Sequence, residues 1–186
     1  YAYYLASPVN WLLILCPKKF IIEFMTILIV LKTGLSGLSF SWYLKKHFGV
    51  KKFGVGFFGI FYALSGYMAA YSWNIMWLDC IMLFPLILLG LEQLVKEKKG
   101  TLYCITLGLS ILSNYYISIM ICIFMVIYVI AQMTLNPPKS FGEFMGTGLR
   151  FAFYSLLAGG LAAVVLLPEI YALQVTASGD FDFPKT

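Results

Sequence analysis

Two ionisable side chains stand inside long apolar runs, where a charge needs a partner. Lys32 is the thirteenth residue of the run 20–44, and Asp79 is the fourth residue of the run 76–95. A lysine near the bilayer centre costs about 2.5–3.5 kcal/mol to insert and usually faces the interior of a helix bundle, paired with an anion. Two interpretations of Lys32 stay open. It contacts the phosphate of a lipid or sugar phosphate, or it forms a structural pair with Asp79 or another acid.

Amide and aromatic side chains accompany Asp79 in the stretch 73–79. The Asn74 amide and the Asp79 carboxylate can form hydrogen bonds with hydroxyls, and the Trp77 indole offers a stacking face. Together these groups supply the chemistry of sugar binding. The same composition is typical of an aromatic belt at a membrane interface, with the carboxylate favouring a helix N-terminus. Because Asp79 lies inside the apolar boundary, we expect a binding role for it.

A second polar group interrupts the long run 101–133. Asn114, Tyr115 and Tyr116 are its most polar point, together with the preceding serine. They either line a cavity that binds a ligand, or form an interfacial turn with two belt tyrosines. Five other acids are expected to be solvated, at helix ends on one side and among lysines on the other: Glu23 and Glu169, then Glu92, Glu97 and Glu143.

Motifs for metals and covalent catalysis are not found. The four cysteines form no CxxC motif and no cluster with the single histidine, His47, so we predict no metal site. No GxSxG, HExxH or phosphate-binding glycine loop occurs. Several carboxylates around an external cavity would suit a divalent metal, but no residue pattern indicates one, and we expect no cofactor.

The composition indicates a membrane protein. The 186 residues are 61% hydrophobic and 11% charged, against about 45–50% and about 25% in soluble domains. A soluble enzyme, a disordered chain and a disulfide scaffold are therefore excluded. The net charge of +5 comes from lysines in short runs between apolar stretches, which are typical topology signals rather than a nucleic-acid-binding surface.

The apolar runs predict an all-α, polytopic transmembrane helical bundle with about four full spans plus a short helical hairpin or re-entrant pair. The run 101–133 has basic segments on both flanks, so it should cross twice or turn back near 113–116. Its first arm, 101–112, measures about 18 Å as a helix, short of the roughly 30 Å hydrocarbon core. We therefore expect the turn to face a cavity open to the outside. The five runs are 20–44, 53–71, 76–95, 101–133 and 149–167.

Orientation and organisation follow from the charges. Nine of the Lys and Arg residues lie in three basic loops and three lie on the opposite side, which places the basic loops in the cytoplasm. We expect one membrane domain, 1–186, forming the N-terminal part of a longer protein. Within it, 1–19 should end an external loop, 20–171 should form the bundle, and 172–186 should begin another external loop.

Six stretches, in order along the chain, resemble the bacterial YfhO family of polytopic membrane proteins. The Ser-Gly-Tyr-Met sequence and the Ser-Trp-Asn to Trp-Leu-Asp segment are the most specific of them. The resemblance covers essentially the whole chain. The stretches are 3–10, 62–68, 72–79, 85–94, 113–116 and 166–171.

The resemblance implies a glycosyltransferase of the GT-C superfamily in the bacterial cytoplasmic membrane, with its active face external. Such an enzyme transfers a sugar, usually with inversion, from an undecaprenyl-phosphate-linked donor to a cell-envelope polymer such as lipoteichoic acid. The catalytic aspartate is expected upstream of Tyr1, so no catalytic residue is assigned in this chain. The substrate-binding candidates are Asn74, Trp77, Asp79, Asn114, Tyr115 and Tyr116, with Lys32 added on physical grounds alone.

Two other functional classes stay open. A membrane transporter or lipid flippase would also use a broken helix pair and a central lysine. A non-catalytic envelope assembly protein would keep its buried charges only as structural pairs. Membrane lipids are expected partners in every case.

Overall fold

A computed structural model describes residues 7–49, 53–137 and 140–175, and every regular element in these ranges is a helix. The prediction of an all-α transmembrane bundle is confirmed. Three stretches are long and apolar enough to cross a membrane, and a bent helix pair makes a fourth if it is counted as one span. The three are Lys18–His47, Ile75–Glu97 and Tyr115–Leu135.

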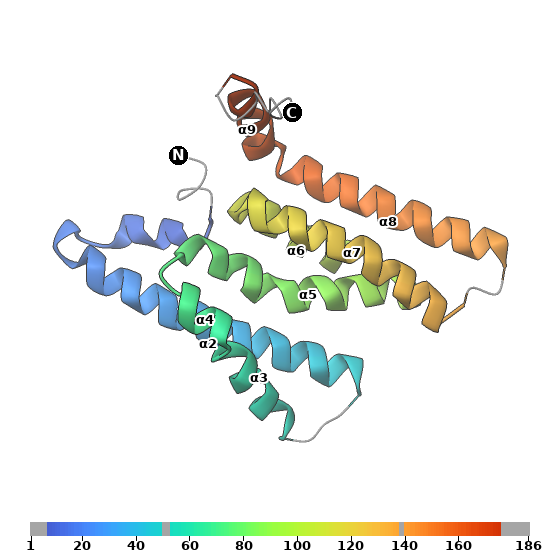
Figure 1. Cartoon of the computed structure of the whole chain (residues 1–186), viewed down its shortest axis with the longest axis horizontal. Coiled ribbons are helices and arrows are strands. Elements are labelled where there is room, and N and C mark those ends of the chain that lie inside the picture. The colour runs from blue at the N-terminus through green and yellow to red at the C-terminus, as the bar shows by residue number, and fades with distance from the viewer. Residues whose placement is uncertain (1–6, 50–52, 138–139, 176–186) are drawn as a thin grey trace, which may run out of the picture.

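Helix α5, Ile75–Glu97, is the axis of the bundle. Four helices pack against it (Figure 1): α2 (Ile21–His47), α6 (Thr101–Ser113), α7 (Tyr115–Leu135) and α8 (Phe141–Leu161). In its most apolar stretch 72% of the residues are buried, compared with 17% in the stretch that contains α2, Ile21–His47, and 28% in α7. The core therefore forms where α5 meets α6, α7 and α8, around side chains such as Leu91, Tyr103 and Met125. The outer faces of α2 and α7 remain covered with exposed apolar side chains.

Glycine allows the closest helix contacts. A Cβ placed on Gly90 of α5 would lie 2.5 Å from the backbone nitrogen of Tyr103, so α5 and α6 touch there through their backbones. A Cβ on Gly37 of α2 would lie 2.9 Å from the carbonyl oxygen of Gly59 in α3, and Ala63 is buried at the same contact. The Gly59/Ala63 spacing follows the small-residue pattern that brings membrane helices together.

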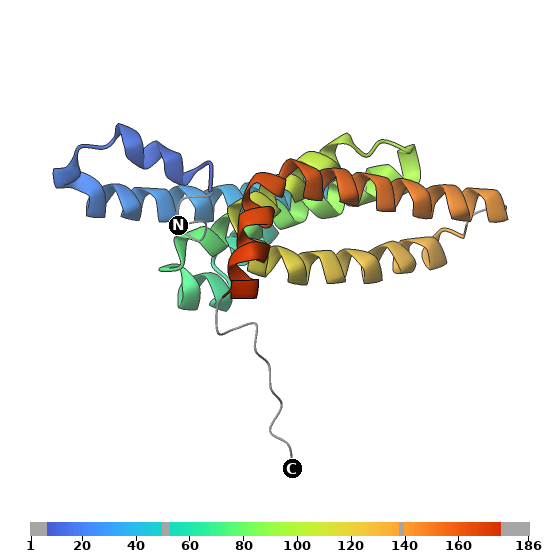
Figure 2. The ribbon, with the colours of Figure 1, turned by 90° about the horizontal axis from the view of Figure 1, so that it is seen from above.

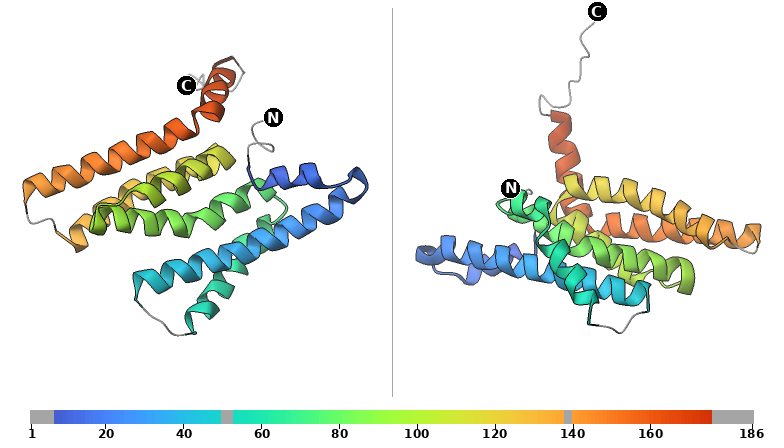
Figure 3. Two further views of the ribbon diagram at one scale, coloured as in Figure 1. Left: turned by 180° about the vertical axis from the view of Figure 1, so that it is seen from behind. Right: turned by 60° about the horizontal axis from the view of Figure 1, so that its bottom comes forward.

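The second apolar run differs from its prediction, because it is not one continuous helix. It forms α3, Val55–Ala63, and α4, Gly66–Tyr71, with the break at Leu64 and Ser65. Ser65 adopts an extended backbone before α4, and the whole unit of 17 residues is shorter than a spanning helix. Figure 3 shows α3 diverging from α2 toward the loop that joins them.

The turn predicted near 113–116, within the run 101–133, is confirmed. Helix α6 is Thr101–Ser113 and α7 is Tyr115–Leu135, so a single residue, Asn114, separates them. Its backbone is extended, and its side-chain oxygen accepts a hydrogen bond from the backbone N–H of Ile117 at 3.0 Å. A helix cap of this kind satisfies one of the free donors that every helix start leaves. The short α6 and the longer α7 form the expected hairpin.

The last apolar run was predicted as one span over 149–167, and this is wrong at both ends. Helix α8, Phe141–Leu161, begins earlier, and α9, Ala163–Val175, follows it at an angle of 75° (Figure 2). Pro168 lies inside α9 rather than ending the run. The bend occurs at Ala162, which is fully buried, as is Ala158 one turn before it. Residues 176–186, predicted to be an external loop, lie outside the described residues.

The contact at Gly90 gives a stability prediction. Gly90→Ala forces α5 away from the α6 backbone and should lower the stability of the protein by about 1–3 kcal/mol, the usual cost of overpacking. Gly34→Ala is the matched control, because a Cβ on Gly34 meets nothing within 4 Å. It should be neutral or stabilising by up to about 1 kcal/mol. Thermal unfolding of the full-length protein in detergent measures both. Equal melting temperatures for the two variants would contradict the packing.

Candidate functional site

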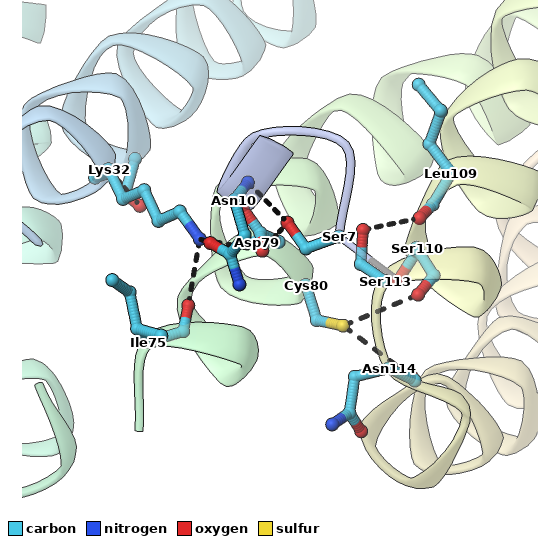
Figure 4. A network of polar contacts seen from close by, with 11 residues as sticks. Ser7, Asn10, Lys32, Ile75, Asp79, Cys80, Leu109, Ser110, Ser113 and Asn114 are labelled. Carbon is cyan, nitrogen blue, oxygen red and sulfur yellow. Dashed lines mark hydrogen bonds and ion pairs between the residues drawn. The ribbon is translucent and has the colours of Figure 1, made fainter. Parts of the chain in front are cut away.

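Lys32 and Asp79 form a buried ion pair that joins α2 to α5. The ammonium nitrogen lies 2.8 Å from Asp79 Oδ2, and the two side chains are 0% and 1% exposed. The same nitrogen donates to Asn10 Oδ1 at 2.7 Å and to the carbonyl oxygen of Ile75 at 3.0 Å (Figure 4). A lysine has three hydrogens to donate, and here each has an acceptor. Of the two interpretations of Lys32, the structure contains the pair with Asp79.

The segment before α2 completes this network. Ser7 Oγ donates to Asp79 Oδ2 at 2.6 Å, and the backbone N–H of Asn10 donates to Ser7 Oγ at 3.4 Å. Two short 3-10 helices follow, η1 (Asn10–Leu15) and η2 (Lys18–Phe20). Ser7 is fully buried and Asn10 is 7% exposed, so this segment is fixed against the start of α5. We call the four residues Ser7, Asn10, Lys32 and Asp79 the outer polar cluster, because the charge pattern predicts that this end of α5 faces the outside.

Sequence reasoning missed Ser7 and Asn10, although a signal was present. Both lie in the stretch 3–10 that carried part of the family resemblance. No helical spacing of apolar residues marks these two positions. The prediction for residues 1–19 was only that they end an external loop. Their contacts with Asp79 and Lys32 join residues more than 20 positions apart, which no local pattern records.

The ion pair disagrees with the membrane depths predicted for Lys32 and Asp79. Lys32 was expected near the bilayer centre and Asp79 just below the outer surface, but paired residues lie at one level. Lys32 is about 16 Å along α2 from Ile21, whereas Asp79 is about 6 Å along α5 from Ile75. Because α2 and α5 run in the same direction, the start of α2 extends about 10 Å beyond the start of α5. The two expected depths therefore cannot both hold.

Three buried polar atoms near this network have no hydrogen-bond partner. They are Asp79 Oδ1, Asn74 Nδ2 and Asn114 Nδ2, from side chains that are 1%, 5% and 3% exposed. Asn74 precedes the first residue of α5, and Asn114 is linked to α5 through Cys80, whose Sγ lies 3.7 Å from the Asn114 carbonyl oxygen. Buried polar atoms in folded proteins nearly always have partners. One acceptor and two donors are thus available here to a ligand or to water.

The aromatic candidates are close in sequence to these polar residues. Trp77 packs on Tyr71 of α4 with ring centroids 5.6 Å apart. Tyr115 begins α7 and is partly buried, and Tyr116 beside it is 50% exposed. A groove of about 410 Å³ runs between α4, α5 and α7, with Tyr67, Cys80 and Ile117 among its walls. None of the predicted binding residues lines this groove. A cavity at the α6–α7 turn that opens to the outside therefore stays a prediction.

A second polar cluster lies at the opposite end of α5, and it overturns the prediction that Glu92 is solvated. Glu92 is 4% exposed, and its Oε1 accepts from Tyr128 at 2.7 Å, from His47 Nδ1 at 2.7 Å and from Tyr43 at 3.2 Å. Lys96 approaches Oε2 at 3.3 Å. These contacts join α2, α5 and α7, so Glu92 connects three helices rather than facing water.

The model of the family "Bacterial membrane protein YfhO" matches residues 1–185. The chain belongs to the YfhO family. A curated relative, "Uncharacterized protein YfhO" of Bacillus subtilis (strain 168), is 24% identical over 133 residues, which cover 69% of this chain and 15% of that protein. No solved structure matches the chain.

Family membership and the apolar helices together establish a bacterial membrane protein. The family match confirms the YfhO resemblance found in the sequence. Within the described ranges, no group of three or more His, Cys, Asp and Glu side chains could hold a metal ion. The roles of the individual residues in binding stay predictions.

The outer polar cluster should respond to mutation as a unit. Lys32→Met leaves the Asp79 carboxylate buried without its cation and should cost about 3–5 kcal/mol of stability. Lys32→Met combined with Asp79→Leu removes both charges and should restore much of that loss. Unfolding midpoints of the single and double variants of the full-length protein measure the coupling. Strictly additive losses would contradict a direct pair.

Proposed function

We propose that the full-length protein is a membrane glycosyltransferase of the GT-C type. It would move a sugar from an undecaprenyl-phosphate-linked donor to an extracellular envelope acceptor such as lipoteichoic acid. Membership of the YfhO family supports a membrane protein of this class, and the sequence resemblance supplies the reaction. The aligned region spans 15% of the length of the Bacillus subtilis relative, so this activity is proposed for the whole protein.

The observation that carries the proposal is the set of unpaired polar atoms at the outer end of α5. A sugar hydroxyl both donates and accepts hydrogen bonds. It can accept from Asn74 Nδ2 or Asn114 Nδ2 and donate to Asp79 Oδ1, the three atoms without partners. Trp77 of α5 and Tyr116 of α7 would supply aromatic faces to the sugar ring. We therefore assign substrate binding to this end of the bundle.

In the proposed reaction an acceptor hydroxyl attacks the anomeric carbon of the donor sugar. The new bond joins that oxygen to the anomeric carbon, the bond from the anomeric carbon to the lipid phosphate oxygen breaks, and the bonding electrons leave with the phosphate. The hydroxyl proton goes to the carboxylate that the resemblance places upstream of Tyr1. Preorganised positive charge stabilises an anion that develops in such a step.

Lys32 enters this scheme in one of two ways. Its three contacts, to Asn10, Ile75 and Asp79, hold the outer polar cluster in place. As the phosphate partner it would have to exchange one of these contacts for the lipid phosphate. The geometry favours a positioning role, in which Lys32 fixes the Asp79 carboxylate whose second oxygen faces the substrate.

Transport is the second candidate, because the 75° bend between α8 and α9 and the break at Asn114 are features of transporters as well. Transport and glycosyl transfer would use the same residues and differ in their products. A transporter moves the lipid-linked sugar across the membrane without forming a new glycosidic bond.

Asn114→Asp tests the proposed site sharply. Aspartate keeps the oxygen that caps α7 and is as good a cap as asparagine, but it loses the free donor. Membranes with the full-length protein receive undecaprenyl-phosphate-linked radiolabelled sugars and purified lipoteichoic acid, and label in the polymer is counted. We expect Asn114→Asp to reduce transfer about tenfold or more, the effect of one lost hydrogen bond in a buried site.

Asn136→Asp is the matched control, because Asn136 ends α7 on the opposite side and its side-chain nitrogen donates to Gln132. It should leave transfer unchanged. An equal loss in both variants, or full transfer by Asn114→Asp, would argue against the site. Folded protein that moves label across the membrane but never into the polymer would favour the transporter.

A further inference from the structure

A large groove lies between α2, α3 and α5, away from the outer polar cluster. Its volume is about 1020 Å³, and its walls include Leu35, Leu38 and Trp42 of α2, Val55 of α3 and Leu86 of α5. It forms where α3 diverges from α2 (Figure 3). Lys45, at one end of the groove, is about 20 Å along α2 from Lys32. The groove therefore belongs to the half of the bundle that carries the basic loops.

The walls of the groove offer almost no polar contacts. Its two serines are satisfied by their own helix, because Ser39 Oγ donates to the Ser36 carbonyl at 2.9 Å and Ser41 Oγ donates to the Gly37 carbonyl at 2.8 Å. Leu38 is 66% exposed and Trp42 is 54% exposed. An exposed apolar patch of this kind marks a site where another apolar group binds.

One charge stands at the end of the groove. Lys45 is exposed and makes no hydrogen bond or ion pair with another described residue. Trp42 lies about 4.5 Å before it along α2, and tryptophan is enriched at the level of the lipid headgroups. An unpaired ammonium group next to an interfacial indole is the arrangement that favours an anionic headgroup.

The length of the groove matches one leaflet of a bilayer. From Leu35 to Lys45 the helix rises about 15 Å, which is half of the roughly 30 Å hydrocarbon core. An acyl chain can thus lie along the groove from the middle of the membrane, with its phosphate at Lys45. Basic pockets between helices on the cytoplasmic side bind anionic lipid headgroups in other membrane proteins.

We propose that this groove binds an anionic phospholipid from the leaflet on the side of the basic loops. One acyl chain lies between α2, α3 and α5, and the phosphate contacts Lys45. The lipid fills the space that α3 leaves as it diverges from α2, and so supports the short, broken α3–α4 unit. This site is independent of the proposed glycosyl transfer, which uses the opposite end of the bundle.

Native mass spectrometry of the full-length protein tests the charge contact. The protein is released from nanodiscs that contain equal amounts of phosphatidylglycerol and phosphatidylcholine, and the retained lipids are counted. We expect phosphatidylglycerol to be retained preferentially. Lys45→Gln should lower its retention about fivefold, the effect of one basic residue near an anionic surface. Lys46→Gln removes the same charge one residue away, outside the groove lining, and should change retention little.

A second pair of variants tests the cavity itself. A Cβ on Gly56, which lines the groove, meets nothing within 4 Å, so Gly56→Leu adds apolar volume to the groove wall from an open position. It should reduce retention of both lipids. Gly54 also has open space but does not line the groove, so Gly54→Leu should leave retention unchanged.

Photo-crosslinking identifies the occupant directly. A benzophenone amino acid in place of Leu38 should capture phospholipid in native membranes. Capture of another segment of the same protein, in place of lipid, would overturn the proposal. Equal retention by Lys45→Gln and Lys46→Gln, or an absence of retained phospholipid in the wild type, would overturn it as well. Glycosyl transfer is assayed separately on the same variants, so that loss of lipid and loss of activity are distinguished.

Discussion

The buried pair of Lys32 and Asp79 is the interaction on which the outer half of this structure depends. A lysine and an aspartate that are 0% and 1% exposed can remain charged only if they face each other and their other polar contacts are satisfied. This requirement fixes α2 against α5 at one level. It also brings Ser7 and Asn10 to the same point, because the pair needs further donors and acceptors. The fold and the candidate site therefore share one cause.

Helix α5 connects two polar clusters at its two ends. Near its outer end Asp79 joins α2 and the preceding segment, and near its inner end Glu92 joins α2 and α7 through tyrosine and histidine. The inner carboxylate has partners for both oxygens, whereas the outer one leaves Oδ1 unpaired. That difference supports a binding role for the outer end and a structural role for the inner end.

The hydrophobic pattern of the sequence predicted the positions of most long helices. The runs around α2 and α5 were placed to within a few residues, and charge parity located the α6–α7 turn at Asn114. The breaks in α3–α4 and α8–α9 were not predicted, because no proline or charge marks Ser65 or Ala162. Glu92 was misassigned because neighbouring lysines suggested water, and its partners Tyr43 and Tyr128 lie on distant helices. Lys32 and Asp79 were recognised singly, but only the packing of α2 on α5 joins them.

The central claim is that the outer end of α5 faces the outside of the cell and binds a lipid-linked sugar. The most direct measurement uses Trp73→Cys in a cysteine-free background of the full-length protein, because Trp73 is 70% exposed and adjoins Asn74. Intact cells are treated with a membrane-impermeant thiol reagent, with and without added undecaprenyl-phosphate-linked sugar. The account predicts labelling from outside that the lipid-linked sugar slows. Labelling only after the cells are opened, or labelling unaffected by the sugar, would contradict it.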